Sequence, residues 1–144
     1  MLIALRDPRD VVLSCFIQKV QLTPISCNWL SLADAADYYA RVMKTWFAVR
    51  QLTPGNWLEF RYEDVVADLE REARKILEFL GLPWDDKVLK FYEHAREKMV
   101  RSPTYKDVTQ PVYRRDVGRW QNYAKYLEPI LATLQPFVKE FGYE

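Results

Sequence analysis

The chain has 144 residues, of which 49% are hydrophobic and 15% aromatic, and its formal net charge at pH 7 is +1. This composition excludes a disordered chain, which would be poor in aromatic residues, and the length suits one domain spanning residues 1–144. The near-neutral charge does not indicate a global field for nucleic acid. No apolar run approaches the roughly 20 residues of a membrane span. With two cysteines outside any Cys-x-x-Cys pair, we expect reduced thiols and a cytoplasmic location.

The first expected element is a short apolar strand, Leu2–Arg6. Asp7 is suited to cap a following helix, and Pro8 fits its first turn, where a missing N–H costs nothing. We expect this helix to extend from about Pro8 to Val20, with the apolar residues Val12, Cys15, Phe16 and Val20 on one side. Asp10, Ser14 and Gln18 recur at every fourth residue and form a polar stripe.

A long amphipathic helix is expected to begin after Ser31, its N-cap, and to end before a turn at residues 52–56. A second strand is expected over Trp57–Tyr62. The helix that follows carries apolar residues from Leu69 to Leu80 on one face. Gly81 predicts its end in a Schellman turn, because glycine readily adopts the left-handed conformation there.

The remaining chain predicts two more helices, one over Asp85–Met99 and one from about Asp116 to Glu140, the latter kinked or divided at its two prolines. Between them lies a polar loop, residues 101–112. Two strands joined through helices predict an α/β fold with a parallel layer that is mostly helical by residue count. The apolar Leu2–Leu5 run is typical of a central strand, so an uncovered sheet edge and self-association are expected.

Two residues near the first strand form a candidate anion site. Ligands of parallel α/β sheets bind beyond the carboxyl ends of the strands, where Arg6 is expected, next to the amino end of a helix. A guanidinium offers forked donors that match a phosphate or sulfate group, and the Ser14 hydroxyl adds a neutral donor. The alternative is a surface arginine paired with Asp7 or Asp10, with Ser14 on a solvated stripe.

Two further segments carry aromatic and basic residues. Tyr62 ends the second strand in the motif "RYED", where its ring could stack on a base or lie as an ordinary strand-end tyrosine. The segment Arg101–Trp120 has a net charge of +3 and interleaved aromatic residues, a pattern that also fits single-stranded nucleic acid. The alternative is a solvated basic loop.

Three stretches in this order, "LRDPRDVVLSCF", "FRYEDVVADLEREARKILEFLGLPWDD" and "VYRRDVGRWQNYAKYLEPIL", resemble the C-terminal part of the sulfotransferase family. The similarity is to bacterial sulfotransferases and tyrosylprotein sulfotransferases. It implies a fold related to P-loop kinases and, as sulfuryl donor, 3′-phosphoadenosine 5′-phosphosulfate (PAPS), with no metal. The acceptor would be a hydroxyl or amine.

The resemblance also assigns roles to five residues. It implies that Arg6 and Ser14 bind the 3′-phosphate of the nucleotide and that Tyr62 contacts the adenine. Thr104 matches a serine that contacts the donor, and Arg119 matches a basic residue at the phosphate end of the nucleotide. No residue is assigned a catalytic role.

The family's Gly/Ser/Thr-rich phosphosulfate loop and its catalytic base have no counterpart in this sequence. The resemblance therefore implies a partial domain, which we expect to be inactive alone. Two other functions stay open at this point: a non-catalytic helical binding module derived from the same fold and, with less support, single-stranded nucleic-acid binding.

Overall fold

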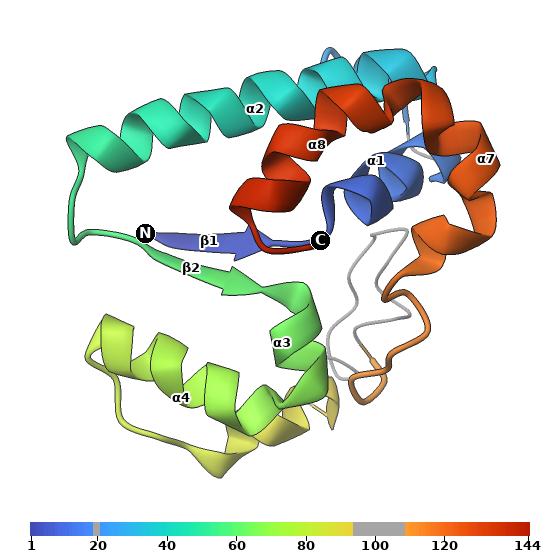
Figure 1. The fold of residues 1–144 in the computed structure, drawn as a ribbon. Coiled ribbons are helices and arrows are strands. Elements are labelled where there is room, and N and C mark those ends of the chain that lie inside the picture. The colour runs from blue at the N-terminus through green and yellow to red at the C-terminus, as the bar shows by residue number, and fades with distance from the viewer. Residues whose placement is uncertain (19–20, 94–108) are drawn as a thin grey trace. The chain divides into compact units, whose positions relative to one another are not determined.

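The computed structural model describes residues 1–18, 21–93 and 109–144 (Figure 1). Two short strands, β1 (Leu2–Leu5) and β2 (Leu58–Arg61), pair as neighbours in a sheet and point in the same direction. The remaining assigned elements are helical: α1 (Pro8–Ile17), η1 (Ser26–Trp29), α2 (Leu32–Leu52), α3 (Tyr62–Ala67), α4 (Leu69–Leu80), η2 (Asp86–Lys90), η3 (Arg119–Tyr123), α7 (Ala124–Leu127), η4 (Glu128–Ile130) and α8 (Leu131–Glu140). The predicted mostly helical fold with two short parallel strands is confirmed.

The chain forms two compact units, which are described separately. The first contains residues 1–4 and 58–115, and the second contains residues 5–57 and 116–144. The second unit therefore joins α1 and α2 to the C-terminal helices. That residues 1–144 make one domain stays a prediction.

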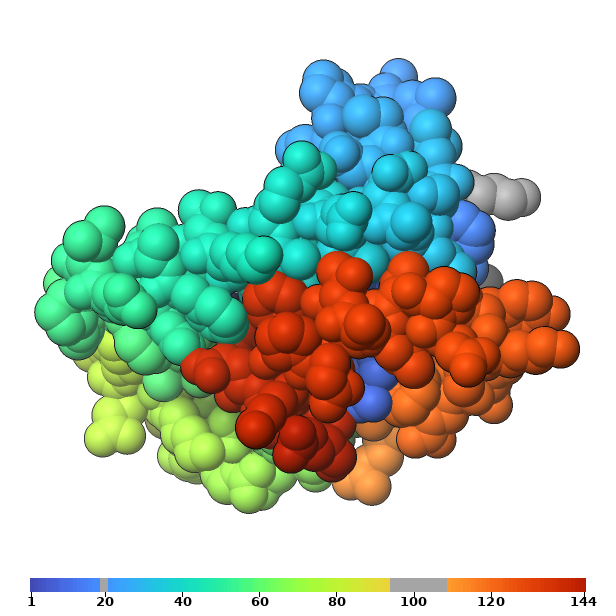
Figure 2. All heavy atoms as spheres, turned by 45° about the horizontal axis from the view of Figure 1, so that its top comes forward, coloured from blue at the N-terminus to red at the C-terminus, as the bar shows by residue number. Residues whose placement is uncertain are grey.

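The core of the second unit lies where α1, α2 and the C-terminal helices meet. Leu127 and Leu134 are fully buried there, and Tyr39 of α2 meets Phe137 of α8 edge to face, with ring centroids 5.6 Å apart. Figures 1 and 2 both show α2 and α8 side by side. The buried members of this cluster are Val12, Ala35, Ala36, Leu127, Ile130 and Leu134.

Helix α1 begins as predicted but ends earlier. The side chain of Asp7 accepts a hydrogen bond from the backbone N–H of Arg9 and caps the helix, which ends at Ile17. Of the apolar side that the sequence indicates, Val12 is buried and Phe16 is exposed, and Leu13 is buried as well. Helical periodicity groups residues on one face without deciding which face packs, and here the packed face includes the carboxylate of Asp10. The predicted last turn at residues 19–20 lies outside the described residues.

Helix α2 follows the predicted pattern closely. Ser31 Oγ accepts a hydrogen bond from the backbone N–H of Asp34 at 3.1 Å, which satisfies one donor of the first turn. The helix ends before the predicted turn, in which Gly55 adopts a positive φ of 78°. Across the described residues, no helix combines the length and apolar character that a bilayer crossing requires.

The first unit holds the sheet, α3 and α4. The Schellman turn at Gly81 is confirmed: the N–H of Leu82 donates to the carbonyl of Leu77 at 2.9 Å, and Gly81 has φ 67°. In the part of this unit that the structure describes, Ala73 is the buried apolar residue, while Leu80 and Leu82 are exposed. The first unit therefore has little apolar core of its own.

The C-terminal region differs from the single helix that we expected. Helical structure begins at Arg119 rather than near Asp116, because the chain first makes a turn in which Gly118 has a φ of 68°. Pro129 lies in the short segment η4, which separates α7 from α8. Pro136 stands inside α8 without ending it. Of the helix predicted over residues 85–99, the described part starts as the 3-10 segment η2, and residues 94–99 lie outside the described residues.

Candidate functional site

Arg6 follows the last residue of β1, and its guanidinium is held in place. Its Nη2 donates a hydrogen bond to the backbone carbonyl of Asp116 at 2.6 Å and lies 3.8 Å from Oδ2 of Asp10. The side chain keeps 23% of its surface exposed. The guanidinium is thus anchored at the strand end and still reaches solvent, as a phosphate-binding arginine must.

Asp10 connects helix α1 to the turn before η3. Its Oδ1 accepts the backbone N–H of Trp120 at 2.7 Å, and its Oδ2 accepts that of Gly118 at 2.8 Å. The residue is 1% exposed. Burial raises the pKa of Asp10, while the N–H of Trp120 and the charge of Arg6 act against that rise. The sequence argument placed Asp10 on a polar stripe and missed this contact.

Arg9, rather than Arg6, forms the ion pair with Asp7. Two nitrogens of Arg9 contact the two carboxylate oxygens of Asp7 at 2.9 and 2.7 Å. The same guanidinium donates to the carbonyl of Tyr143 at 2.8 Å and lies 3.9 Å from the ring centroid of Trp120. Of the two alternative partners considered for Arg6, Asp7 forms an ion pair with Arg9, and Asp10 lies 3.8 Å from Arg6.

Ser14 and Arg119 belong to the same unit as Arg6. Ser14 lies one helical turn after Asp10 on α1 and is half-buried. Arg119 is the first residue of η3, is half-buried, and stands between the two residues whose amides Asp10 binds. The structure therefore brings the strand end, helix α1 and the segment carrying Arg119 together, although 110 residues separate Asp10 from Trp120.

The other two predicted site residues are placed differently. Tyr62 does not end the strand: it is the first residue of α3, in the first unit, and is half-buried. The acidic residues Glu63 and Asp64 favour a helix start there, since negative charge stabilises the first turn. Thr104 lies outside the described residues, as do the other residues of the basic segment from 101 to 108.

The described end of the basic segment engages neighbouring groups. The guanidinium of Arg115 lies 4.3 Å from the ring centroid of Tyr113, and Arg114 reaches the carbonyl of Ala67 at 3.5 Å. Tyr113 and Arg115 therefore face each other, an arrangement that a stacking nucleic-acid base would have to displace.

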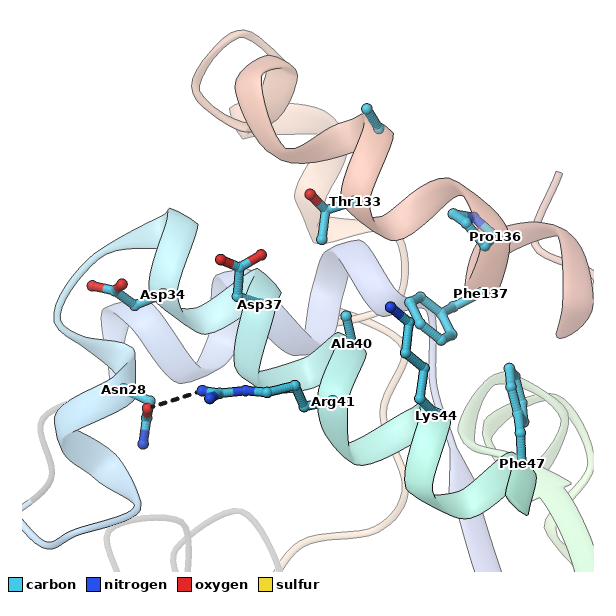
Figure 3. Close-up of a pocket in the computed structure, with 11 residues that line it drawn as sticks. Asn28, Asp34, Asp37, Ala40, Arg41, Lys44, Phe47, Thr133, Pro136 and Phe137 are labelled. Carbon is cyan, nitrogen blue, oxygen red and sulfur yellow. Dashed lines mark hydrogen bonds between the residues drawn. The ribbon is translucent and has the colours of Figure 1, made fainter.

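A groove of about 810 Å³ lies between α2 and α8 (Figure 3). Its α2 wall carries Asp34 and Asp37 followed by Arg41 and Lys44, and Arg41 contacts Asn28 at 3.4 Å. The α8 wall is mostly apolar. The two carboxylates at one end oppose an anionic ligand, so this groove suits a nucleotide phosphate less well than the Arg6 region. Over the described ranges, no group of three or more His, Cys, Asp or Glu side chains is placed to hold a metal ion.

Comparison with known proteins identifies the family. Residues 1–86 match the sequence profile of the sulfotransferase family. The chain belongs to the sulfotransferase family. The match includes β1, α1 and the strand β2 with the helices after it, so it covers both Arg6 and Ser14 of this sulfotransferase chain.

Three relatives of this chain are considerably longer than the part that it matches. An uncharacterized protein of Aquifex aeolicus (strain VF5) is 35% identical over 99 residues, 69% of this chain and 12% of that protein. Protein-tyrosine sulfotransferase A of Caenorhabditis elegans is 33% identical over 96 residues, which cover 61% of this chain and 23% of that protein. Sulfotransferase 1A1 of Mus musculus is 29% identical over 140 residues, and the match covers 81% of this chain and 47% of that protein. The chain thus spans less than half the length of these relatives.

Proposed function

We propose that this sulfotransferase chain binds the 3′-phosphate and adenine side of PAPS for sulfuryl transfer to a hydroxyl or amine acceptor. The observation that carries the proposal is the anchored Arg6 guanidinium beyond β1, within the same unit as Ser14 and Arg119. PAPS is the usual donor of the family and, when bound, supplies the sulfuryl group.

The donor chemistry of these residues fits a dianionic phosphate. The two guanidinium groups offer donors only, and the Ser14 hydroxyl adds one O–H donor; phosphate oxygens accept hydrogen bonds from both kinds of group. Asp10, 3.8 Å from Arg6, is the carboxylate that would oppose the ligand, but both its oxygens already accept backbone N–H groups. Its charge is therefore partly compensated by these two amides, so the residues still fit a phosphate.

The proposal also includes two residues outside this cluster. Tyr62, at the start of α3, is proposed to contact the adenine, and Thr104 the donor, on the strength of the family resemblance. A relation to P-loop kinases is likewise proposed, supported by two parallel strands followed by helices. The two free cysteines, Cys15 and Cys27, support a cytoplasmic location.

The test is a calorimetric titration with 3′-phosphoadenosine 5′-phosphate and with adenosine 5′-phosphate, which lacks the 3′ group. The wild type should prefer the 3′-phosphorylated nucleotide. Arg6→Ala should weaken the binding of 3′-phosphoadenosine 5′-phosphate by about 10- to 150-fold, because one charge-assisted contact is lost. The affinity for adenosine 5′-phosphate should change little. Arg6→Lys should lose much of the affinity for 3′-phosphoadenosine 5′-phosphate, because an ammonium group lacks the planar fork.

Arg50→Ala is the matched control. Its side chain is 24% exposed, almost the same as that of Arg6, and it pairs with Glu140 in the same unit. It should leave both affinities unchanged. Equal affinity of the wild type for the two nucleotides would remove the 3′-phosphate assignment and favour a non-catalytic helical module, and binding of single-stranded oligonucleotides in preference to either would favour the nucleic-acid alternative.

The proposal includes inactivity of these 144 residues alone. None of their four glycines belongs to a glycine-rich phosphate loop of the P-loop type. An assay of labelled sulfate transfer from PAPS to phenols, tyrosine peptides and sugars should show no turnover above the uncatalysed rate. Clear turnover would contradict this part of the proposal and leave the nucleotide assignment intact.

A further inference from the structure

The turn from Asp116 to Trp120 is held by residues at the strand–helix junction. Arg6 donates to the carbonyl of Asp116, and Asp10 accepts from the amides of Gly118 and Trp120. The guanidinium of Arg9 stacks on the Trp120 ring at 3.9 Å. Every one of these partners lies within the five residues Arg6–Asp10, so a single short segment determines where the turn lies.

Asp10 is the central member of this set. It binds the amides on both sides of Arg119, at 2.8 and 2.7 Å, and stands 3.8 Å from the guanidinium of Arg6. A carboxylate can accept both N–H groups because each of its oxygens is an acceptor. An asparagine offers one acceptor oxygen, and its NH₂ group would face the second amide as donor against donor. The chemistry of the contact therefore requires an aspartate.

We propose that Asp10 is a positioning residue for the 3′-phosphate site, acting through the backbone on both sides of Arg119 and through the guanidinium of Arg6. This inference rests on the proposed function, since it assigns Asp10 a part in binding the same phosphate. Asp10 itself does not touch the ligand. Its contribution is to fix two cationic residues that are distant in sequence so that their donors meet one anion without reorganisation.

The direction in which Asp10→Asn changes phosphate affinity distinguishes a positioning role of Asp10 from a purely electrostatic one. If Asp10 acted only as a nearby negative charge, Asp10→Asn would remove repulsion and strengthen phosphate binding. If Asp10 positions the turn and Arg6, the same substitution must weaken phosphate binding. The two roles therefore predict opposite changes in the affinity for 3′-phosphoadenosine 5′-phosphate.

The first measurement follows the amides without any ligand. Hydrogen exchange by NMR should show protected amides at Gly118 and Trp120 in the wild type. Loss of an acceptor should accelerate their exchange at least about tenfold in Asp10→Asn. Glu72→Gln is the control, since Glu72 is also buried but belongs to the other unit, and should leave both amides unchanged. Unprotected amides in the wild type, or unchanged exchange in Asp10→Asn, would overturn the inference. The wild-type measurement tests the inference even if the Asp10→Asn variant does not fold.

The second measurement is the ratio of affinities for 3′-phosphoadenosine 5′-phosphate and adenosine 5′-phosphate. Asp10→Asn should lower this preference about tenfold, the effect of one misplaced charge-assisted contact, with the affinity for adenosine 5′-phosphate within roughly twofold of wild type. A merely destabilised fold would weaken both nucleotides alike, and Asp10→Glu, which keeps both acceptors, should recover part of the preference. An unchanged or larger preference in Asp10→Asn would overturn the positioning role. A wild type without any preference would instead refute the proposed function, while the exchange data would still decide whether Asp10 holds the turn.

Discussion

The backbone N–H of Trp120 lies 2.7 Å from Oδ1 of Asp10, although 110 residues separate the two in the chain. The contact joins helix α1, which follows the first strand, to the turn that starts the C-terminal helices. Both residues lie in the second unit, and the same carboxylate lies 3.8 Å from the Arg6 guanidinium and binds the amides on both sides of Arg119.

The protonation of Asp10 should make stability depend on pH in an unusual direction. Burial raises its pKa above the ordinary value of 3.8. Between 3.8 and the raised pKa, the folded state keeps a proton that the unfolded state has released, so stability falls as the pH rises. We expect the free energy of unfolding of the wild type, relative to Asp10→Asn, to fall by up to about 1.4 kcal/mol per pH unit in that window. Urea unfolding at closely spaced pH values measures it, and a flat difference would contradict it.

Glu72 should show the opposite dependence. The hydrogen bond from Lys75, with that from Arg71, holds the pKa of Glu72 below its ordinary value of 4.5, and burial acts the other way. Its contribution to stability is complete above pH 4.5 and is lost as the pH falls through the lowered pKa. In the same urea experiment, the wild type should lose stability relative to Glu72→Gln on acidification. If the wild type instead gained stability relative to Glu72→Gln on acidification, the pKa of Glu72 would not be lowered in the folded state.

Two arginines that stack on tryptophans allow a test of whether burial of the arginine's ion pair sets its contribution to stability. Arg9 lies over Trp120 and Arg74 over Trp84, each at 3.9 Å, and each also pairs with a carboxylate. The Arg9 side chain is 15% exposed and that of Arg74 is 51% exposed. Arg9→Ala should cost about 3 kcal/mol, because it removes the ion pair between Arg9 and the buried Asp7.

Arg74→Ala should cost under about 1 kcal/mol, as expected for an exposed pair. Thermal unfolding of both variants, followed by tryptophan fluorescence, measures the difference. Equal losses in the two variants would mean that stacking, rather than burial of the ion pair, sets the effect.

The first unit should open more readily than the second. A two-stranded sheet is marginally stable by itself, and in the described part of the first unit the buried apolar residue is Ala73. Hydrogen exchange should therefore be faster at β1 and β2 than in α2 around Ala36 or in α8 around Leu134. Equal protection in the two units would contradict this expectation.

Exposed apolar residues on β1 should promote self-association. Met1 and Leu2 are exposed, and the other strand of their sheet is β2. Sedimentation at ~100 μM, where exposed strand edges favour association, should show a dimer or larger species. Leu2→Lys should shift the chain toward monomer, whereas Leu52→Lys, an equally simple change at an exposed helix end, should not. A wild-type monomer under these conditions would refute the expectation.

Local chemistry could be predicted from sequence because it acts over a few residues. The caps at Asp7 and Ser31 and the left-handed Gly81 depend on side chains and backbone within one helical turn, and the structure confirms all three. The family could also be recognised, since its motifs occur in a fixed order. The start of the C-terminal helices could not be predicted, because it depends on a glycine turn whose amides bind a distant carboxylate.

What the sequence alone determined is the two strands, the starts of α1 and α2, the end of α4 at Gly81 and the family to which the chain belongs. Only the tertiary structure decided which side of α1 is buried, that Arg9 rather than Arg6 pairs with Asp7, and that Asp10 binds the amides beside Arg119. The physical reason is that Asp10 binds backbone amides more than 100 residues away, and that Arg9, besides pairing with its neighbour Asp7, contacts the distant Tyr143 carbonyl and Trp120 ring. A backbone N–H has no sequence signature, so its partner becomes known only when the chain has folded around it.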